Sequence, residues 1–375
     1  MRLHNFNAGP AALPLPVLEE AQRDLVDYRG TGLSVLEMSH RGGAYDEIHR
    51  QAVDGVARLL GVGEGTRVLL LQGGASLEFA MVPLNLLAAG GRADYVVTGE
   101  WSKKALAEAK RVAAERGGEA RVAASTEGEG FRRVPRPNEI ALGGAADQKA
   151  ADYLHVTSNN TIFGTQWREL PETGDVPLVV DASSDALSRR LPAEGIALLY
   201  AGAQKNLGPA GVTVVAVRDD LLDRAPETLP AILRYRTHAE KDSLYNTPPT
   251  FGVYLLGLVV RWIEAEGGVA AIEATNETKA QLLYAALDES DFFRGHAEPE
   301  SRSRMNVTFR ATAGRDEPDE ALEKRLAAEA AEAGMIGLKG HRSVGGLRAS
   351  LYNAVSLESV AVLVDFLRDF ARRNG

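Results

Sequence analysis

Two charged residues follow short apolar runs and could meet at one site. Lys205 comes just after the apolar run 197–200 and lies among small, uncharged neighbours in Gly202-Ala203-Gln204-Lys205-Asn206. Asp181 ends the apolar run 177–180, and the interval to Lys205 accommodates one connection and one further strand. A lysine that loses water at a strand end is destabilised as an ammonium, so its neutral amine becomes available for Schiff-base chemistry with a carbonyl.

A carboxylate near such a lysine suits one planar cofactor. An aspartate that faces a pyridine nitrogen keeps that nitrogen protonated and the ring an electron sink, which is the tuning that a pyridoxal phosphate enzyme requires. Ligands of parallel sheets bind beyond the carboxyl ends of the strands, where both side chains are expected. Each residue alone has a simpler interpretation, since Lys205 could be a surface lysine in a loop and Asp181 could cap a helix.

A glycine turn and a tryptophan extend this hypothesis. Gly73-Gly74-Ala75-Ser76 follows the predicted strand 68–71 and opens a helical pattern near Leu77. Free backbone N–H groups at such a helix start, with the Ser76 hydroxyl, could bind a phosphate. A tight turn that binds no ligand would have the same sequence pattern. Trp101 closes the run 95–100 and could stack on a flat heteroaromatic ring, or it could belong to the core.

Two His-Arg pairs could bind a small anion. They occur in Ser39-His40-Arg41-Gly42-Gly43 and in Gly340-His341-Arg342-Ser343, and Arg348 follows the second pair. Guanidinium groups grip carboxylates and phosphates bidentately, and neighbouring glycines let them crowd around a small ligand. The alternative is a solvated basic face.

Composition excludes several classes of protein. The 42 lysines and arginines against 51 acidic residues give a net charge of -9 without basic runs, so no nucleic-acid partner is expected. Without cysteine there is no thiolate metal site or cysteine nucleophile, and a reducing cytoplasmic location fits. No histidine spacing predicts a metal site, and no dinucleotide fingerprint occurs. The apolar run 251–260 is far shorter than the roughly 20 residues of a membrane span.

The elements that must position these residues alternate between short apolar strands and helices. The predicted strands are residues 68–71, 95–97, 122–124, 154–156, 178–180, 197–200 and 212–217. A helix over 102–116, capped by Ser102, separates two of them and buries Leu106, Ala109, Val112 and Ala113. This alternation predicts an α/β doubly wound fold, with a mainly parallel sheet covered by helices on both faces.

The pattern changes after residue 250. A long helix over 251–266 and a second helix precede a strand at 306–309, a helix at 317–333, a glycine-rich stretch, a strand at 348–352 and a terminal helix. We therefore predict a large cofactor-binding domain of residues 1–250, with an N-terminal substrate-binding segment, and a smaller C-terminal α+β domain of residues 251–375. The proline pair 248–249 is the candidate linker.

Several motifs, in order along nearly the whole chain, resemble the phosphoserine aminotransferase family, which are class V pyridoxal phosphate enzymes of aminotransferase fold type I. The motifs are Phe6-Asn7-Ala8-Gly9-Pro10, Ser39-His40-Arg41-Gly42, Gly73-Gly74-Ala75-Ser76, Gly202-Ala203-Gln204-Lys205-Asn206, Tyr245-Asn246-Thr247-Pro248-Pro249-Thr250-Phe251, and Gly340-His341-Arg342 with Arg348-Ala349-Ser350. The chain departs from the family at Asn160, where glutamate is frequent, and at Ala75, where a third glycine can stand. Residues 117–150 match nothing that the family assigns.

The resemblance implies roles for the cofactor site. Lys205 would hold pyridoxal 5'-phosphate as a Schiff base and move a proton during the reaction, and Asp181 would face the pyridinium nitrogen. The other implied cofactor contacts are stacking by Trp101, a hydrogen bond from Thr161 to the phenolic oxygen, and phosphate binding by Ala75, Ser76 and Gln204, with Asn246 and Thr247 from the neighbouring subunit.

The resemblance also implies the substrates, L-glutamate and 3-phosphohydroxypyruvate, which a phosphoserine transaminase converts to 2-oxoglutarate and O-phospho-L-serine in serine biosynthesis. Family members also serve pyridoxine biosynthesis. Arg348 would bind the carboxylate next to the reacting carbon. The distal phosphate or carboxylate would meet His40 and Arg41, with His341 and Arg342 from the partner in a homodimer that shares its active sites.

Other functions stay open at this point. The nearest is an aminotransferase for another small 2-oxo acid. A cysteine desulfurase shares the fold but uses a thiol that this chain lacks. A nucleotide-binding dehydrogenase on a similar sheet is disfavoured by the missing fingerprint, and a non-catalytic scaffold would bind no pyridoxal phosphate.

Overall fold

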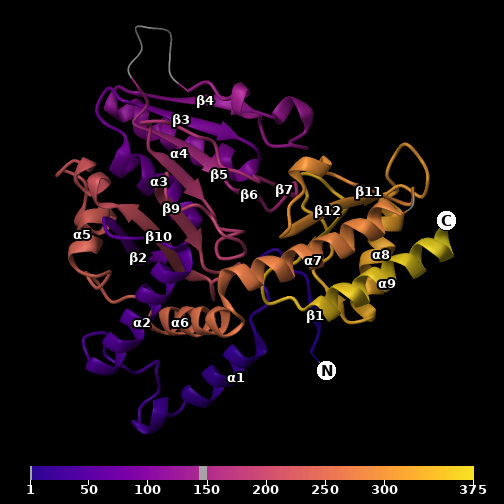
Figure 1. Ribbon diagram of the computed structural model, residues 1–375, viewed down its shortest axis with the longest axis horizontal. Helices are drawn as coiled ribbons and strands as arrows, with labels where there is room; N and C mark the ends of the chain where they lie inside the picture. Colours follow the sequence, from indigo (N-terminus) through magenta and orange to yellow (C-terminus); the bar gives the residue numbers. More distant parts are fainter. Residues whose placement is uncertain (1, 143–149, 290) are drawn as a thin grey trace.

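A seven-stranded sheet forms the centre of the larger part of the molecule (Figure 1). The computed structural model describes residues 2–142, 150–289 and 291–375. The strand order is β2-β10-β9-β8-β5-β3-β4. The bounds are β2 (Thr66–Gly73), β3 (Arg92–Val97), β4 (Glu119–Ser125), β5 (Tyr153–Thr157), β8 (Leu178–Asp181), β9 (Ile196–Gly202) and β10 (Gly211–Arg218). Each predicted strand of the first 250 residues lies within one of these, which confirms the strand predictions and the α/β fold class.

The sheet is mainly parallel, as predicted, with one reversal. Neighbouring strands from β4 through β3, β5 and β8 to β9 run parallel. Strand β10 runs antiparallel to both β9 and β2. A reversal needs no helical crossover, so residues 203–210 turn directly from β9 into β10. Lys205 lies in this turn, beyond the carboxyl end of β9.

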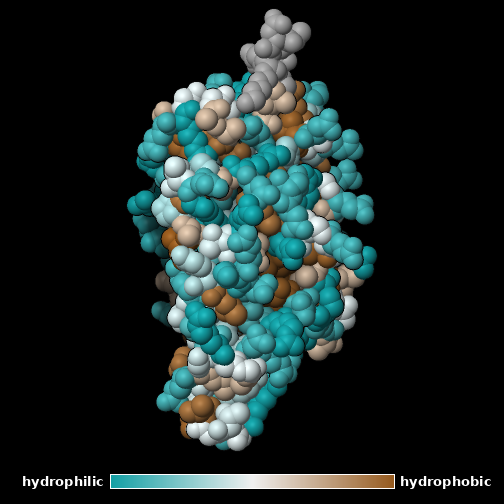
Figure 2. Space-filling model, turned by 90° about the vertical axis from the view of Figure 1, so that its left-hand side faces the viewer, coloured by the Kyte–Doolittle hydropathy of each residue, from teal (hydrophilic) through white to brown (hydrophobic). Residues whose placement is uncertain are grey.

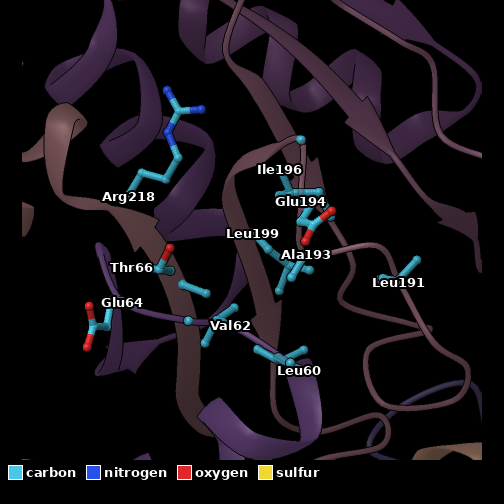
Figure 3. Close-up of a pocket in the computed structure, with 14 residues that line it drawn as sticks. Leu60, Val62, Glu64, Thr66, Leu191, Ala193, Glu194, Ile196, Leu199 and Arg218 are labelled. Carbon is cyan, nitrogen blue, oxygen red and sulfur yellow. The ribbon is translucent and has the colours of Figure 1, made fainter.

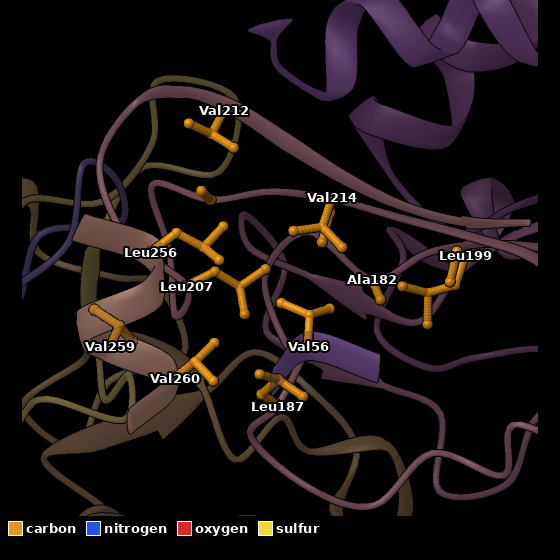
Figure 4. Packing of buried hydrophobic residues seen from close by; sticks show 14 of the residues in the cluster. Val56, Ala182, Leu187, Leu199, Leu207, Val212, Val214, Leu256, Val259 and Val260 are labelled. Atoms are coloured by element: carbon orange, nitrogen blue, oxygen red, sulfur yellow. The ribbon is translucent and has the colours of Figure 1, made fainter. Parts of the chain in front are cut away.

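Helices cover both faces of the sheet. Along β8 the side chains alternate, so that Leu178 and Val180 join one hydrophobic cluster and Val179 joins another. The first cluster includes residues of α2 (Gly43–Leu60) and α6 (Thr250–Ala265), and Figure 4 shows Val56 of α2 and Val260 of α6 within it. A Cβ at Gly55 would lie 2.3 Å from Cγ1 of Val260, so glycine is what permits this close approach of α2 and α6.

The second face is covered by α3 (Ala75–Leu86) and α4 (Glu100–Arg116). The predicted cap of α4 was wrong, because Gly99 is the N-cap residue and Ser102 is the third helical residue. The Ser102 hydroxyl accepts hydrogen bonds from the backbone N–H of Thr98 at 3.0 Å and of Gly99 at 3.1 Å. A short hydroxyl serves either position, which is why the pattern alone misplaced it. The predicted buried face of the helix is confirmed.

The smaller part of the molecule has its own core. Strands β11 (Phe293–Gly295), β12 (Asn306–Ala311) and β14 (Leu347–Ser350) form an antiparallel sheet. It packs with α7 (Gly268–Asp288), α8 (Glu320–Glu332) and α9 (Leu357–Asn374) around a third hydrophobic cluster. The N-terminal segment joins this part, because β1 (His4–Asn5) pairs in parallel with β13 (Met335–Ile336) and Phe6 is fully buried in the third cluster.

The predicted division of the chain at residue 250 stays a prediction. Helix α6 begins at that point and packs with the core of the larger part, whereas the third cluster takes its buried residues from Phe6 and from Ala280 onward. Pro248 is buried and Pro249 is the N-cap residue of α6, so this pair enters the helix directly and is not a free linker. Among the described residues, the remaining α-helices and strands are α1 (Leu15–Asp24), α5 (Tyr235–Glu240), β6 (Asn159–Asn160) and β7 (Thr165–Gln166).

One face of the molecule is mostly hydrophilic. In the face that Figure 2 shows, hydrophobic side chains lie scattered among polar ones. The segment between α1 and α2 exposes several large apolar side chains, which are Leu25, Val26, Leu33 and Leu36. Among the described residues, no helix has the length and apolar character that a membrane crossing needs. Part of the unassigned segment 117–150 forms β4, which follows the C-cap residue Gly117 of α4, and its residues 143–149 lie outside the described residues.

Candidate functional site

Asp181 and Lys205 lie at the same edge of the sheet, as their spacing predicts. Asp181 is the last residue of β8 and pairs with Tyr200 of β9, which ends two residues later at Gly202. The turn that follows β9 carries Lys205, and its charge acts electrostatically on Asp181. The carboxyl ends of β3, β5, β8 and β9 therefore surround one site.

The Asp181 carboxyl group is buried, with 4% of the residue exposed. Burial raises the pKa of this carboxyl to about 6, while hydrogen bonds from Ser183 and the charge of Lys205 act in the opposite direction. The Ser183 backbone N–H donates to Oδ1 of Asp181 at 3.0 Å. Among the described residues no arginine or lysine pairs directly with Asp181, so this carboxylate is suited to a cation that a ligand supplies.

The side chain of Lys205 lies against the N-terminal segment. Its Nζ donates a hydrogen bond of 2.6 Å to the backbone carbonyl of Ala8 and lies 5.9 Å from the ring centroid of Tyr352. A Cβ at Gly9 would lie 2.8 Å from Cε of Lys205, and the φ of Gly9 is +142°. The glycine in Phe6-Asn7-Ala8-Gly9-Pro10 is therefore needed for the close approach to this lysine.

Two of these contacts were not predicted from the sequence. Ala8 lies in a motif that was recognised but given no role, and Tyr352 was placed only at the end of a strand. The carbonyl of Gln204 also accepts from the Ala11 N–H at 2.9 Å, so the N-terminal segment is attached on both sides of the lysine. Backbone carbonyls carry no residue type, so the sequence offers no signal for them.

The glycine turn lies where the phosphate hypothesis needs it. Helix α3 begins at Ala75 rather than near Leu77, with Gly74 as its N-cap residue. The backbone N–H groups of Ala75 and Ser76 are at the first two helical positions, where no acceptor within the helix exists. Nδ2 of Asn246 donates to Oε1 of Gln72, one residue before the turn, at 3.0 Å. Asn246 therefore lies beside the turn of its own chain. That it binds the cofactor phosphate of the neighbouring subunit stays a prediction.

Trp101 and Thr161 lie at the ends of neighbouring strands. Trp101 is the second residue of α4, half-buried, and Nζ of Lys104 lies 4.6 Å from its ring centroid. Thr161 is buried, and its carbonyl accepts from Nη1 of Arg348 at 3.1 Å. This contact links β14 of the smaller part to the site, and the Nε of Arg348 is buried without a partner.

The second His-Arg pair lies near this arginine. Burial lowers the pKa of His341, and the charges of Arg348 and Arg342 lower it further. Glu100 and Lys104 also act on His341, so residues 341–344 lie close to the start of α4 in the same chain. Whether this pair serves its own site or that of a partner stays a prediction.

The first His-Arg pair lies apart from these groups. His40 and Arg41 occupy the turn before α2, where the N–H of Gly42 donates to the carbonyl of Ser39. Arg41 is exposed, and Nε2 of His40 is buried without a partner. Within the described residues, no hydrogen bond or ion pair joins either side chain to Lys205, Asp181 or Arg348. One chain alone does not bring the whole predicted anion site together.

A separate pocket lies at the opposite end of the strands. Its volume is about 360 Å³, and it opens between the start of β2, the start of β9 and the end of β10 (Figure 3). Glu64, Glu194 and Arg218 contribute its charges. Because the ligand edge of a parallel sheet is the carboxyl edge, this pocket is not the predicted site. In the part of the chain that the structure describes, no cluster of histidines and acidic residues could hold a metal.

The residues at the carboxyl edge fit pyridoxal phosphate. Buried polar atoms are normally paired, yet several here have no partner, which are Oε1 of Gln204, Oγ1 of Thr157 and Nε of Arg348. Asp181 adds a buried carboxylate, Lys205 an amine, and the start of α3 free N–H groups. Pyridoxal phosphate has a ring nitrogen that can be cationic, a carbonyl and a phosphate, which match the Asp181 carboxylate, the Lys205 amine and the N–H groups at the start of α3, respectively.

Comparisons with known proteins agree with this chemistry. The family model for class-V aminotransferases matches residues 3–363. The phosphoserine aminotransferase of Lysinibacillus sphaericus is 53% identical over 374 residues, which cover 100% of this chain and 99% of that protein. A solved phosphoserine aminotransferase from Bacillus circulans subsp. alkalophilus has a TM-score of 0.94 and 51% identity, with coverage of 100% of this chain and 99% of the other.

A solved phosphoserine aminotransferase from Trichomonas vaginalis, described as bound to PLP, gives a TM-score of 0.91 at 37% identity and covers 98% of this chain and 100% of its own. These matches confirm the predicted fold type, the enzyme class and the pyridoxal phosphate cofactor. This chain therefore belongs to the phosphoserine aminotransferase family of class-V, pyridoxal phosphate-dependent aminotransferases.

Proposed function

We propose that this chain is a phosphoserine transaminase, which transfers the amino group of L-glutamate to 3-phosphohydroxypyruvate and gives O-phospho-L-serine and 2-oxoglutarate. The observation that carries the proposal is the convergence of Lys205, Asp181 and Arg348 at the carboxyl edge of one sheet. The relatives that share about half of its residues over their full length carry the same name.

The chain's own groups hold the cofactor, which when bound supplies the electron sink and stores the amino group between two half-reactions. Asp181 would keep the proton on the ring nitrogen, because a buried carboxylate without a directly paired cation favours a cation there. Trp101 would cover the ring, and Thr161 would donate to its phenolic oxygen. The N–H groups of Ala75 and Ser76 would donate to the phosphate, together with the amide Nε2 of Gln204.

Lys205 provides the amine that moves a proton. The neutral amine takes a proton from the carbon that carries the amino group and returns it to another atom of the same conjugated system. Its hydrogen bond of 2.6 Å to the carbonyl of Ala8 keeps the free amine beside the site. Gly9 and Tyr352 border the lysine and exclude water from one side of it.

Arg348 orients the substrate. One nitrogen of its guanidinium group is tied to the carbonyl of Thr161, which fixes the plane of the group, and its Nε stays available to a carboxylate. Arg342, Lys104 and His341 lie near Arg348 and can meet a phosphate or a second carboxylate. The positive charges of Arg342, Lys104 and Arg348, which outnumber the nearby charge of Glu100, accept both anions without a specific fit, so one site can serve two substrates in turn.

A spectral titration tests the proposed function. Adding L-glutamate to the purified enzyme with bound cofactor should remove the visible absorbance of pyridoxal phosphate, and 3-phosphohydroxypyruvate should then restore it, because each substrate reverses the change that the other makes. Hydroxypyruvate, which lacks the phosphate, is the matched control and should restore the absorbance far more slowly. An enzyme with bound cofactor that does not respond to glutamate would rule out the proposal.

A homodimer with shared active sites is part of the proposed function, and a cytoplasmic location stays a prediction. Two observations support the dimer. The exposed apolar residues at 25–36 are unusual for a free surface, and His40 and Arg41 follow them directly in the chain. A partner that covers this segment could also join the first His-Arg pair to the rest of the anion site.

Complementation between two inactive variants tests the shared site. Lys205→Ala and Arg342→Ala should each lose activity as homodimers. If Arg342 serves the partner's site, a mixed dimer contains one site with both residues intact, and the mixed dimer purified after co-expression should have about half of the normal activity. If Arg342 serves its own site, neither site is intact and the purified mixed dimer stays inactive. Co-expression of two Lys205→Ala chains is the control and should give an inactive dimer.

A further inference from the structure

Tyr352 shares a hydrogen-bond acceptor with Lys205. Its hydroxyl donates to the backbone carbonyl of Ala8 at 2.8 Å, and Nζ of Lys205 donates to the same oxygen at 2.6 Å. A carbonyl oxygen has two lone pairs, so it accepts both bonds at once. Tyr352 is 1% exposed, so water does not compete for its hydroxyl. When Lys205 turns away from Ala8, the bond from Tyr352 can hold the carbonyl in place.

A buried chain of side chains sets the direction of the Tyr352 hydroxyl. Nδ2 of Asn159 donates to Oδ1 of Asn306 at 2.8 Å, and Nδ2 of Asn306 donates to the Tyr352 oxygen at 3.2 Å. The Ser303 hydroxyl donates to Oδ1 of Asn159, which fixes how this first amide is turned. Because the Tyr352 oxygen already accepts a bond, its own hydrogen is left to point at Ala8.

Hydrogen bonds also hold the backbone around Tyr352. The ammonium of the fully buried Lys279 donates to the carbonyls of Leu351, Tyr352 and Val355, each at 2.9 Å. The N–H of Asn353 donates to Oδ1 of Asn206, the residue after Lys205, at 3.0 Å. The segment 351–355 therefore connects α7 of the smaller part to the turn that carries the catalytic lysine.

We propose that Tyr352 is a positioning residue that holds the Ala8 carbonyl as the resting acceptor for Lys205 whenever this amine is not bonded to the cofactor. The inference rests on the proposed function, because transamination alternates between a cofactor bonded to the lysine and an aminated cofactor with the lysine free. The Ala8 carbonyl stabilises only the state with the free lysine. Tyr352 thereby shifts the balance of the glutamate half-reaction toward the aminated cofactor.

Tyr352→Phe tests this role with little risk to the fold. The substitution keeps the ring and the backbone contacts to Lys279, and Nδ2 of Asn306 still donates to Oγ of Ser350 at 3.0 Å. The equilibrium constant of the glutamate half-reaction, read from the visible spectrum at fixed ratios of glutamate to 2-oxoglutarate, should fall by about threefold to tenfold, the range for one hydrogen bond. A purely structural role would leave this ratio unchanged.

Tyr284→Phe is the matched control. Tyr284→Phe also loses one hydrogen bond to a backbone carbonyl, that of Ser303 at 3.0 Å, while the Ser303 hydroxyl keeps its bond to Asn159. Tyr284 has no hydrogen bond to Lys205 or Ala8. This variant should keep the equilibrium constant of the native enzyme. Thermal melting of both variants shows that each is folded.

A second measurement needs neither cofactor nor substrate. In the cofactor-free protein, acetylation of Lys205 by acetic anhydride, followed by peptide mass spectrometry, should be about threefold to tenfold faster in Tyr352→Phe than in native protein or in Tyr284→Phe, because the amine has lost its fixed acceptor. Unchanged acetylation in a folded Tyr352→Phe would overturn the inference. If glutamate does not change the visible spectrum of the native enzyme with bound cofactor, the proposed function is contradicted instead. The acetylation rates would still decide the role of Tyr352.

Discussion

Replacing Lys205 with alanine should lower kcat by about 10²-fold to 10⁴-fold or more, because general acid-base catalysis by a positioned group contributes that much. Among the described residues, Lys205 is the lysine that lies beside Ala8 and acts on Asp181. The fold should persist. The hydrogen bond that Lys205 gives up is the one to Ala8, whose carbonyl keeps the bond from Tyr352. Steady-state rates and thermal melting on the same preparation measure both effects.

The control is an exposed lysine. Lys241→Ala removes a side chain at the surface, beyond the helix α5, and should leave kcat and melting unchanged. The alanine variant at position 205 should still bind pyridoxal phosphate through Asp181 and the phosphate turn, but without the absorbance of the lysine-bound cofactor. Native steady-state activity in Lys205→Ala would remove this residue from its proposed role.

Replacing Asp181 with asparagine should weaken the binding of pyridoxal phosphate by about tenfold to 100-fold at pH 7.5, since a hydrogen bond to a charged group is lost. The effect should depend on pH. Burial raises the pKa of this carboxyl to about 6 in the cofactor-free chain, so it is ionised at pH 7.5 and protonated at pH 5. The native affinity should fall about tenfold per pH unit below 6, and the asparagine variant should lose that part of the dependence.

The Asp181 carboxyl should also affect the free energy of unfolding. Replacing it with asparagine should stabilise the cofactor-free protein, although the same substitution weakens cofactor binding. A carboxyl whose folded pKa lies above its unfolded value of about 4 stabilises the folded protein at low pH, and this contribution disappears as the pH rises through 6. Near pH 7 the cofactor-free Asp181→Asn protein should therefore be more stable than the native one, by up to about 3 kcal/mol. Near pH 4 the two should be similar.

Urea unfolding of the cofactor-free proteins at both pH values measures this difference. Asp54→Asn is the control, because Asp54 is exposed and its substitution should give the same small change at each pH. A native protein that is more stable than Asp181→Asn at pH 7, without cofactor, would show that the carboxylate is satisfied by the chain itself. Its assignment as the partner of a ligand cation would then fail.

The sequence by itself determined the central sheet and the ends of its strands. Parallel strands buried on both faces are apolar throughout, so β5, β8 and β9 could be recognised without any knowledge of their neighbours. Lys205 and Asp181 stood out because a charge directly after such a strand has to lie at the ligand edge. Both signals lie within a few neighbouring residues, so they can be recognised in a single sequence.

Tertiary structure decided the features that join distant segments. The reversal of β10 depends on its pairing with both β9 and β2, and the place of Ser102 depends on where the chain leaves β3. Nothing in the composition near residue 352 indicates that a tyrosine there meets Ala8 and supports Lys205. Such contacts arise when two cores pack together, and their energy comes from groups hundreds of residues apart, so no local pattern can encode them.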